Sequence, residues 1–325
     1  MTKLAVLGGG AWGTALAASL ARAGKNPVLW ARDQAVVDDI GRNRKNTKYL
    51  GDIRLPEGIH PTTDPAALRL ADVILVSVPT QTLRPVLSDL CAVIERSAIL
   101  VLCAKGIETT TGSRVSAIAA DVMADNRLAI LSGPSFAVDV ARWLPTAVTL
   151  AAASIEEASA IAEEISAPAF RPYASDDIIG VEIGGALKNV IALAVGMARA
   201  QGLGASAEAA LTTRGFAELA RIARHFGGKS ETLMGLSCLG DLMLTCSSPQ
   251  SRNFAYGMAV GRGEKREGLR LAEGVYTTRI ACAICEKAGI DAPIIRVIDA
   301  VLSEKIDLDA AMAALLARPL KKETD

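Results

Sequence analysis

A lysine in the middle of an apolar helical pattern over residues 178–200 is the first candidate for chemistry. Residues 184–189 read Gly-Gly-Ala-Leu-Lys-Asn, so Lys188 lies among small and apolar neighbours. Burial lowers the pKa of a lysine toward the range in which it can exchange a proton with a substrate oxygen. The alternative is a structural lysine whose ammonium group extends to the surface. We favour proton transfer, because the small residues allow another group to approach closely.

Two further segments carry side chains suited to hydroxyl and phosphate recognition. Asp241 could orient Lys188 or bind a hydroxyl group, and Ser251, Arg252 and Asn253 follow ten residues later. An arginine at the start of a helix can contact a phosphate through two parallel hydrogen bonds. Taken alone, Ser251 is a helix N-cap and Arg252 a surface charge. Together, these groups predict a pocket for a small phosphorylated hydroxy or keto compound.

Glycines near the N-terminus have the spacing of a dinucleotide-binding turn. Residues 4–7 form a short apolar run typical of a buried parallel strand, and Gly8, Gly10 and Gly13 follow in G-x-G-x-x-G order. In this motif the first glycine permits a tight turn, the second lets the backbone approach a pyrophosphate, and the third lets the helix lie close to its strand. The spacing alone is weak evidence. A helix pattern follows at once, however, and a second strand at 27–31, as the motif requires.

The end of this second strand predicts the cofactor preference. Residues 30–33 read Trp-Ala-Arg-Asp. An acidic residue at this position binds the ribose hydroxyls of NAD, whereas an arginine accommodates the 2′-phosphate of NADP. We interpret Arg32 as the 2′-phosphate contact and Asp33 as the N-cap of the next helix, so we expect NADP(H) to be preferred and NAD(H) to be possible. The alternative is that Arg32 is merely exposed.

Two loops that follow later strands bring more polar groups to the same edge. Lys105 comes after a predicted strand at 97–103, and Gly133 and Ser135 come after one at 128–131. Ligands of parallel sheets collect beyond the carboxyl ends of the strands. Lys105 could be an ordinary solvated lysine, but its position favours a role in the site.

Alternating strand and helix patterns must position these residues. The expected strands lie at residues 4–7, 27–31, 72–78, 97–103, 128–131, 146–151 and 170–174, with a polar excursion at 43–61. The expected helices lie at residues 14–23, 34–42, 80–94, 155–165, 178–200, 207–226, 232–236, 251–261, 277–287 and 294–301. We therefore predict an α/β protein: a Rossmann-like parallel sheet domain at residues 1–175 with right-handed crossovers, then an all-helical substrate domain at residues 176–325.

Composition excludes several classes of function. Lys plus Arg and Asp plus Glu number 35 each, so no net charge attracts nucleic acid or an anionic membrane. The apolar stretch 181–198 resembles a membrane span, but its polar residues favour a buried helix. The two histidines, His60 and His225, lie in unrelated contexts, which leaves little support for a Ser-His-Asp or metal site. We expect a cytoplasmic protein with reduced thiols at six apolar positions: Cys91, Cys103, Cys238, Cys246, Cys282 and Cys285.

Seven segments together resemble one enzyme family. They occur in family order at residues 8–15, 104–106, 133–137, 187–189, 239–241, 251–253 and 273–275. The sequence closely resembles NAD(P)-dependent glycerol-3-phosphate dehydrogenases of the bacterial type. The resemblance implies reversible reduction of dihydroxyacetone phosphate to sn-glycerol 3-phosphate for glycerophospholipid synthesis, by a cytoplasmic homodimer.

The resemblance also implies roles for matching positions. Lys188 resembles the proton-transfer residue, with Lys105 and Asp241 beside it. The implied substrate contacts are Lys105, Gly133, Ser135, Lys188, Asp241, Ser251, Arg252 and Asn253. The implied cofactor contacts are Gly8, Gly10, Ala11, Trp12, Gly13, Arg32, Lys105, Ala137, Arg252, Leu271 and Glu273. Two positions depart slightly from the family pattern: Ala11 stands where many relatives have serine, and Leu271 where a smaller aliphatic residue is frequent.

Two other functions remain open at this stage. One is a dehydrogenase of similar architecture that acts on a β-hydroxy acid or an acyl thioester, for which residues 251–253 would not depend on phosphate. The other is a non-catalytic NADP(H) sensor that retains the fold. The presence of both Lys188 and Asp241 disfavours the sensor.

Overall fold

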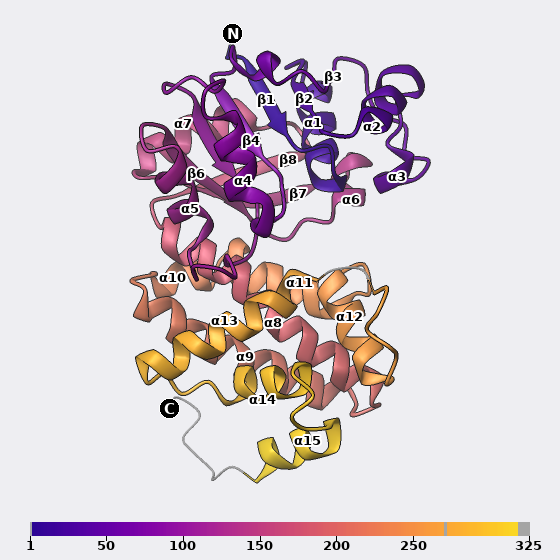
Figure 1. Ribbon diagram of the computed structural model, residues 1–325, viewed down its shortest axis with the longest axis vertical. Helices are drawn as coiled ribbons and strands as arrows, with labels where there is room; N and C mark the ends of the chain where they lie inside the picture. The colour runs from indigo at the N-terminus through magenta and orange to yellow at the C-terminus, as the bar shows by residue number, and fades with distance from the viewer. Residues whose placement is uncertain (1, 270–271, 318–325) are drawn as a thin grey trace.

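An eight-stranded sheet forms the N-terminal part of the protein (Figure 1). The computed structural model describes residues 2–269 and 272–317. The strands are β1 (Leu4–Leu7), β2 (Val28–Trp30), β3 (His60–Thr62), β4 (Val73–Val76), β5 (Ile99–Leu102), β6 (Arg127–Ser132), β7 (Thr146–Ala151) and β8 (Phe170–Ser175). Their order is β3-β2-β1-β4-β5-β6-β7-β8, and every neighbouring pair except β6 and β7 is parallel. The prediction of an α/β sheet domain is confirmed.

The sheet is mostly parallel, as predicted, and the exception is β7, which runs antiparallel to β6 with Ser132 opposite Thr149. The connection between these strands contains only the five-residue helix α6 (Ala137–Ala141). A helix of that length spans about 7 Å, whereas a six-residue strand spans about 20 Å, so α6 cannot carry the chain back along the sheet. Helix α6 packs against α1 (Ala11–Arg22) instead.

Strand β3 falls where the sequence predicted a polar excursion. Pro61 in its centre weakens the strand pattern, because proline cannot donate to a sheet ladder. The strand lies at the edge of the sheet, where one side of the backbone needs no partner. Proline is compatible with that position.

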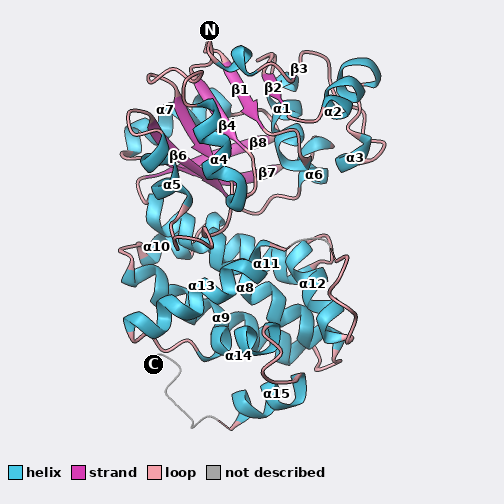
Figure 2. Ribbon diagram, viewed as in Figure 1, coloured by secondary structure: helices cyan, strands magenta, loops and turns pink. Residues whose placement is uncertain are grey.

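Helices cover both faces of the sheet (Figure 2). Besides α1 and α6 they are α2 (Gln34–Asp38), α3 (Thr47–Leu50), α4 (Thr80–Leu90), α5 (Val115–Val122) and α7 (Ile155–Ile165), with a π-helical turn at Asp39–Asn43 and a 3-10 turn at Pro65–Leu68. Successive residues of β1 enter different apolar clusters: Leu4 and Val6 face one side, Ala5 and Leu7 the other. This two-sided burial explains why β1 is a continuous apolar run.

The helical domain surrounds one central helix, α8 (Ile178–Ala200). The others are α9 (Ala205–His225), α10 (Ser230–Leu233), a π-helical turn (Leu236–Gly240), α11 (Asp241–Ser247), α12 (Arg252–Gly261), α13 (Glu273–Ala288), α14 (Pro293–Leu302) and α15 (Leu308–Leu316). The sequence did not predict α11 or α15. Helix α8 is long and apolar enough to cross a bilayer, but 89% of its most apolar window is buried inside the protein. It is therefore the core helix of this domain. Two residues separate the end of β8 from the start of α8, and we propose the domain boundary at 175/176.

Glycines allow α12 to pack directly on the backbone of α8. A Cβ atom at Gly196 would lie 2.2 Å from the carbonyl oxygen of Phe254, and one at Gly257 would lie 2.2 Å from that of Leu193. No residue larger than glycine fits at either position without displacing a helix. The contact holds the N-terminus of α12, which carries Ser251, near the middle of α8.

Candidate active site

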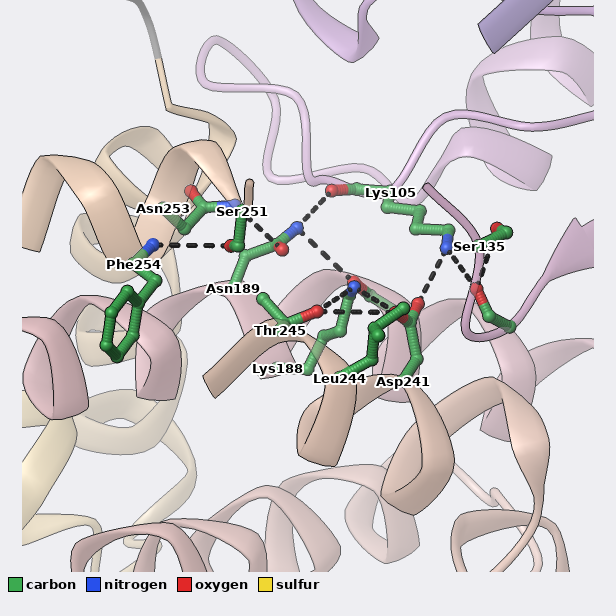
Figure 3. A network of polar contacts seen from close by, with 12 residues as sticks. Lys105, Ser135, Lys188, Asn189, Asp241, Leu244, Thr245, Ser251, Asn253 and Phe254 are labelled. Carbon is green, nitrogen blue, oxygen red and sulfur yellow. Dashed lines mark hydrogen bonds and ion pairs between the residues drawn. The ribbon is translucent and has the colours of Figure 1, made fainter. Parts of the chain in front are cut away.

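Two lysines bind one carboxylate where the sheet domain meets the helical domain (Figure 3). Lys105 follows β5, Lys188 lies in the middle of α8, and Asp241 begins α11. The Lys105 Nζ atom lies 2.6 Å from Asp241 Oδ2, and the Lys188 Nζ atom lies 2.5 Å from Asp241 Oδ1. The structure thus brings together three predicted residues that lie far apart in the sequence.

Burial and charge set the ionisation of this cluster. Burial of the Lys188 ammonium group, together with the charge of Lys105, outweighs the attraction of Asp241 and lowers the pKa of Lys188 to about 8. Burial opposes ionisation of Asp241 as well, but the two ammonium groups outweigh it and hold the pKa of Asp241 below its usual value. Asp241 therefore stays ionised at neutral pH, and Lys188 can gain or lose a proton close to it.

Thr245 is a site residue that the sequence analysis did not single out. Its hydroxyl oxygen accepts a hydrogen bond of 2.6 Å from Lys188 Nζ and donates one of 3.3 Å to Asp241 Oδ1. Thr245 follows Asp241 by four residues, which places both side chains on one face of α11. That spacing is the signal that could have identified it. The threonine fixes the direction of the Lys188 ammonium group.

The loop after β6 supplies the other partner of Lys105. Lys105 Nζ donates to the carbonyl oxygen of Gly133 at 2.9 Å, and the Ser135 hydroxyl donates to the same oxygen at 3.0 Å. A Cβ atom at Gly133 would lie 2.8 Å from Cα of Val148 on β7. The predicted Gly133 and Ser135 therefore lie beside the lysine cluster, which consists of Lys105, Lys188 and Asp241. Glycine is required where the loop passes β7.

Two asparagines connect the cluster to α12 and α13. Asn189 Nδ2 donates to the Lys105 carbonyl oxygen at 3.1 Å, and Asn189 Oδ1 accepts a hydrogen bond of 2.8 Å from Asn253. Asn253 Oδ1 in turn accepts from the Gly274 amide at 2.9 Å. The sequence predicted a site role for Asn253 but no separate role for Asn189. Both amides are engaged within the protein and hold the surrounding elements in register.

The N-terminus of α12 presents a cation. Ser251 caps the helix, since its hydroxyl oxygen accepts a hydrogen bond of 3.3 Å from the Phe254 amide. Arg252 follows, is exposed, and makes no hydrogen bond or ion pair among the described residues. Burial raises the pKa of Glu273, and the nearby charge of Arg252 partly offsets this effect. Helix N–H groups and a free guanidinium group suit an anion at this point.

The glycine turn lies at the carboxyl end of β1 and leads directly into α1, which Ala11 and Trp12 begin. Gly8 has a φ of +122°, and a Cβ atom at Gly13 would lie 1.9 Å from the Gly8 carbonyl oxygen. A Cβ atom at Gly10, in contrast, would meet nothing within 4 Å. Contacts inside the protein therefore explain the first and third glycines, whereas the second faces open space, as close approach of a pyrophosphate requires.

The remaining predicted cofactor residues lie on several elements, and one of them lies outside the described residues. Arg32 follows β2, is exposed, and has no partner among residues 2–269 and 272–317. Ala137 begins α6, which packs on α1. Glu273 Oε1 accepts a hydrogen bond of 3.3 Å from the Thr80 amide, across the two domains. Leu271 lies outside the described residues.

Comparisons with known proteins identify the family. Residues 3–158 match the model of the NAD-dependent glycerol-3-phosphate dehydrogenase N-terminus, and residues 177–313 match that of the C-terminus. The chain is 55% identical over 323 residues to glycerol-3-phosphate dehydrogenase (NAD(P)+) of Brucella canis, covering 99% of each chain, and 54% identical over 321 residues to that of Chelativorans sp., covering 98% of each. A crystal structure of glycerol-3-phosphate dehydrogenase from Coxiella burnetii is 36% identical and superposes with a TM-score of 0.92, covering 98% of this chain and 99% of that chain. The chain therefore belongs to the NAD-dependent glycerol-3-phosphate dehydrogenase family.

Proposed function

We propose that the protein catalyses the reversible, NAD(P)H-dependent reduction of dihydroxyacetone phosphate to sn-glycerol 3-phosphate. The observation that carries this proposal is the buried Lys188 ammonium group, with a pKa lowered to about 8 and held by Asp241 beside Lys105. A reduction of a ketone needs a proton donor at the oxygen that becomes a hydroxyl group. Lys188 meets that need.

The residues of the lysine cluster have different roles in the proposed reaction. Bound NAD(P)H supplies the hydride. Lys188 Nζ gives its proton to the substrate oxygen, and the Lys105 ammonium group stabilises the negative charge that develops there. Asp241 holds both lysines and keeps Lys188 protonated more often than burial alone would allow. In the reverse direction Lys188 accepts the proton.

The phosphate group of the substrate is bound by the N-terminus of α12. Arg252 is exposed and unpaired among the described residues, and Ser251 fixes the first turn of the helix beside it. Asn253 supports this turn by binding Asn189 and Gly274. A doubly charged phosphate gains more from an arginine and helix N–H groups than a neutral hydroxyl does. This contrast is the basis of the preference for a phosphorylated substrate.

NADP(H) is the preferred cofactor in this proposal, and two observations support it. Arg32 is free to contact a 2′-phosphate. Asp33, which could otherwise bind ribose hydroxyls, is occupied: its Oδ1 atom accepts from the Ala35 amide at 3.0 Å and its Oδ2 atom lies 2.7 Å from Lys48 Nζ. With Lys48 neutralising Asp33, the end of β2 carries one net positive charge.

The wider role is proposed on the same basis. We infer a cytoplasmic homodimer whose product enters glycerophospholipid synthesis from the resemblance to the family to which the chain belongs. The catalytic roles of Lys188, Lys105 and Asp241 belong to this proposal, as do the cofactor and substrate contacts named above.

An absorbance assay of NADPH oxidation tests the function directly. Purified protein is mixed with NADPH and either dihydroxyacetone phosphate or unphosphorylated dihydroxyacetone. We expect rapid oxidation with the phosphorylated ketone and much slower oxidation with the other, because only the first engages Arg252. Equal rates, or activity only with a β-hydroxy acid and NADP+, would overturn the proposed substrate.

A further inference from the structure

Asn46 lies in the segment that the sequence suggested to be a polar excursion, yet its side chain is fully buried. Its exposed fraction is 0%. It occupies the N-cap position of α3, but its side chain makes no capping hydrogen bond there. A buried amide group needs hydrogen-bond partners, because leaving one unsatisfied costs free energy. The Nδ2 group of Asn46 finds its acceptors in the glycine turn and in α1 rather than in its own helix, whereas its Oδ1 atom has no hydrogen-bond partner among the described residues.

The Asn46 amide holds the middle of the glycine turn. Its Nδ2 atom donates to the carbonyl oxygen of Gly9 at 3.0 Å and to the Thr14 hydroxyl oxygen at 2.7 Å. The Thr14 hydroxyl group lies 3.5 Å from the same Gly9 oxygen. One carbonyl group of the turn is thus held by side chains from two different elements, α3 and α1.

Fixing this carbonyl group also fixes the next amide. No peptide bond among the described residues is cis, and in a trans peptide the C=O and N–H groups point in opposite directions. With the Gly9 C=O directed at Asn46, the Gly10 N–H points away from Asn46. No hydrogen bond among the described residues uses that N–H, and Gly10 is the glycine that faces open space.

We propose that Asn46 is a positioning residue for the pyrophosphate of the cofactor. It holds the peptide between Gly9 and Gly10 so that the Gly10 N–H is already oriented to donate to a pyrophosphate oxygen. Glycines on both sides give this peptide wide conformational freedom, which would otherwise be lost at the moment of binding. The inference rests on the proposed function, because it assumes that NAD(P)H occupies the turn.

The segment around Asn46 is built as a fixed support. The Thr47 amide donates to Asp39 Oδ2 at 2.8 Å, and the Leu55 amide donates to the Arg44 carbonyl oxygen at 2.8 Å. Leu50 is buried in the apolar cluster on that face of the sheet. A donor on a well-held segment can restrain the turn, whereas one on a mobile loop would have to be ordered itself.

Replacing Asn46 by leucine tests the proposal, because leucine has a similar size, carries no charge and cannot donate. The dissociation constants of NADPH and of adenosine 2′-monophosphate are measured by titration, the latter because it retains the 2′-phosphate and lacks the pyrophosphate. For Asn46→Leu we expect the dissociation constant of NADPH to rise about 5- to 10-fold, the usual effect of one hydrogen bond. The dissociation constant of adenosine 2′-monophosphate should stay unchanged.

Leu50→Ala is the matched control, since it weakens the same segment without touching the turn. It should lower the unfolding temperature while leaving both dissociation constants unchanged. Unchanged NADPH binding in Asn46→Leu, or equal weakening of both ligands, would overturn the role of Asn46, the latter by indicating a displaced segment. If the wild-type protein itself bound no NADPH, the proposed function would fail first, and the inference with it.

Discussion

The glycine turn and the lysine cluster make opposite use of charge. The turn, residues 8–13, is contiguous in sequence and presents backbone N–H groups without any ionised side chain. The lysine cluster, defined as Lys105, Lys188 and Asp241, joins three ionised groups from separate elements. Backbone dipoles need no counter-charge, whereas buried ammonium groups do. A substrate that enters the cluster must therefore compete with an existing ion pair, but a cofactor phosphate at the turn need not.

The largest expected effect is on kcat, and it comes from a substitution that changes the lysine cluster but not the glycine turn. Lys188→Ala should lower kcat by at least ~100-fold, the low end for a positioned general acid, because the proton donor is lost. The dissociation constant of NADPH should not change, since the turn is intact. Steady-state kinetics and a binding titration measure the two quantities. Lys25→Ala, at the partly exposed lysine that contacts α7, is the control and should leave both as in the wild type. Turnover close to normal in Lys188→Ala would contradict the mechanism.

The second prediction concerns the cofactor side alone. Arg32→Ala should reduce the preference for NADPH over NADH, expressed as the ratio of kcat/KM values, by about 10- to 100-fold, as expected for a charged hydrogen bond to phosphate. Activity with NADH should persist, because the cluster is untouched. Arg42→Ala removes a nearby exposed arginine that pairs with Asp38 and serves as the control. An unchanged ratio in Arg32→Ala would remove this arginine from the 2′-phosphate site.

The third prediction uses pH to titrate the cluster. The lowered pKa of Lys188, about 8, means that the protonated donor is depleted above that pH. For ketone reduction, kcat/KM should fall about tenfold per pH unit well above the pKa, because one proton is involved, and for alcohol oxidation it should rise toward the same pKa. Rates recorded in both directions from pH 6 to roughly 10 define the falling limb of the reduction profile and the rising limb of the oxidation profile.

Asp241→Asn sharpens this test. Asp241 raises the pKa of Lys188, so removing its charge should move both limbs to lower pH. The same limbs in wild type and Asp241→Asn would show that another group controls the rate.

The smallest predicted effect separates Lys48 from Arg32. Lys48→Met frees the Asp33 carboxylate, which then repels a 2′-phosphate and can accept ribose hydroxyls. We expect the NADPH preference to fall only about threefold, because exposed ion pairs are weak. Lys45→Met, which breaks a similar surface pair with Asp52, is the control. A gain in NADPH preference in Lys48→Met would contradict the neutralising role of Lys48.

The sequence predicted best what is local in the chain. The strand, turn and helix at residues 4–22 depend on neighbours in sequence, and the structure has all three. The direction of β7 could not be predicted from its own residues, because it depends on what the short helix α6 can span. Strand β3 could not be predicted, because Pro61 interrupts the strand pattern. Its position at the edge of the sheet, which tolerates proline, is known only once the whole sheet is seen.

The site shows the same division. Lys188 stands out because a charge interrupts an apolar pattern, but nothing near it indicates that Asp241 is its partner. Thr245 could have been predicted, since it follows Asp241 by four residues, which is helical spacing. Asn46 was not, because an asparagine in a polar segment is ordinary until its contact with Gly9, 37 residues away, is known.

The glycine contacts between α8 and α12 determine how this family member can diverge. At Gly196 and Gly257 the spacing of the two helices is set by main-chain atoms, with no side chain in between. Exchanges among the leucines and valines of the surrounding core therefore leave that spacing unaltered. Core side chains of the helical domain can therefore be substituted during evolution while the distance from Lys188 to the start of α12 stays the same.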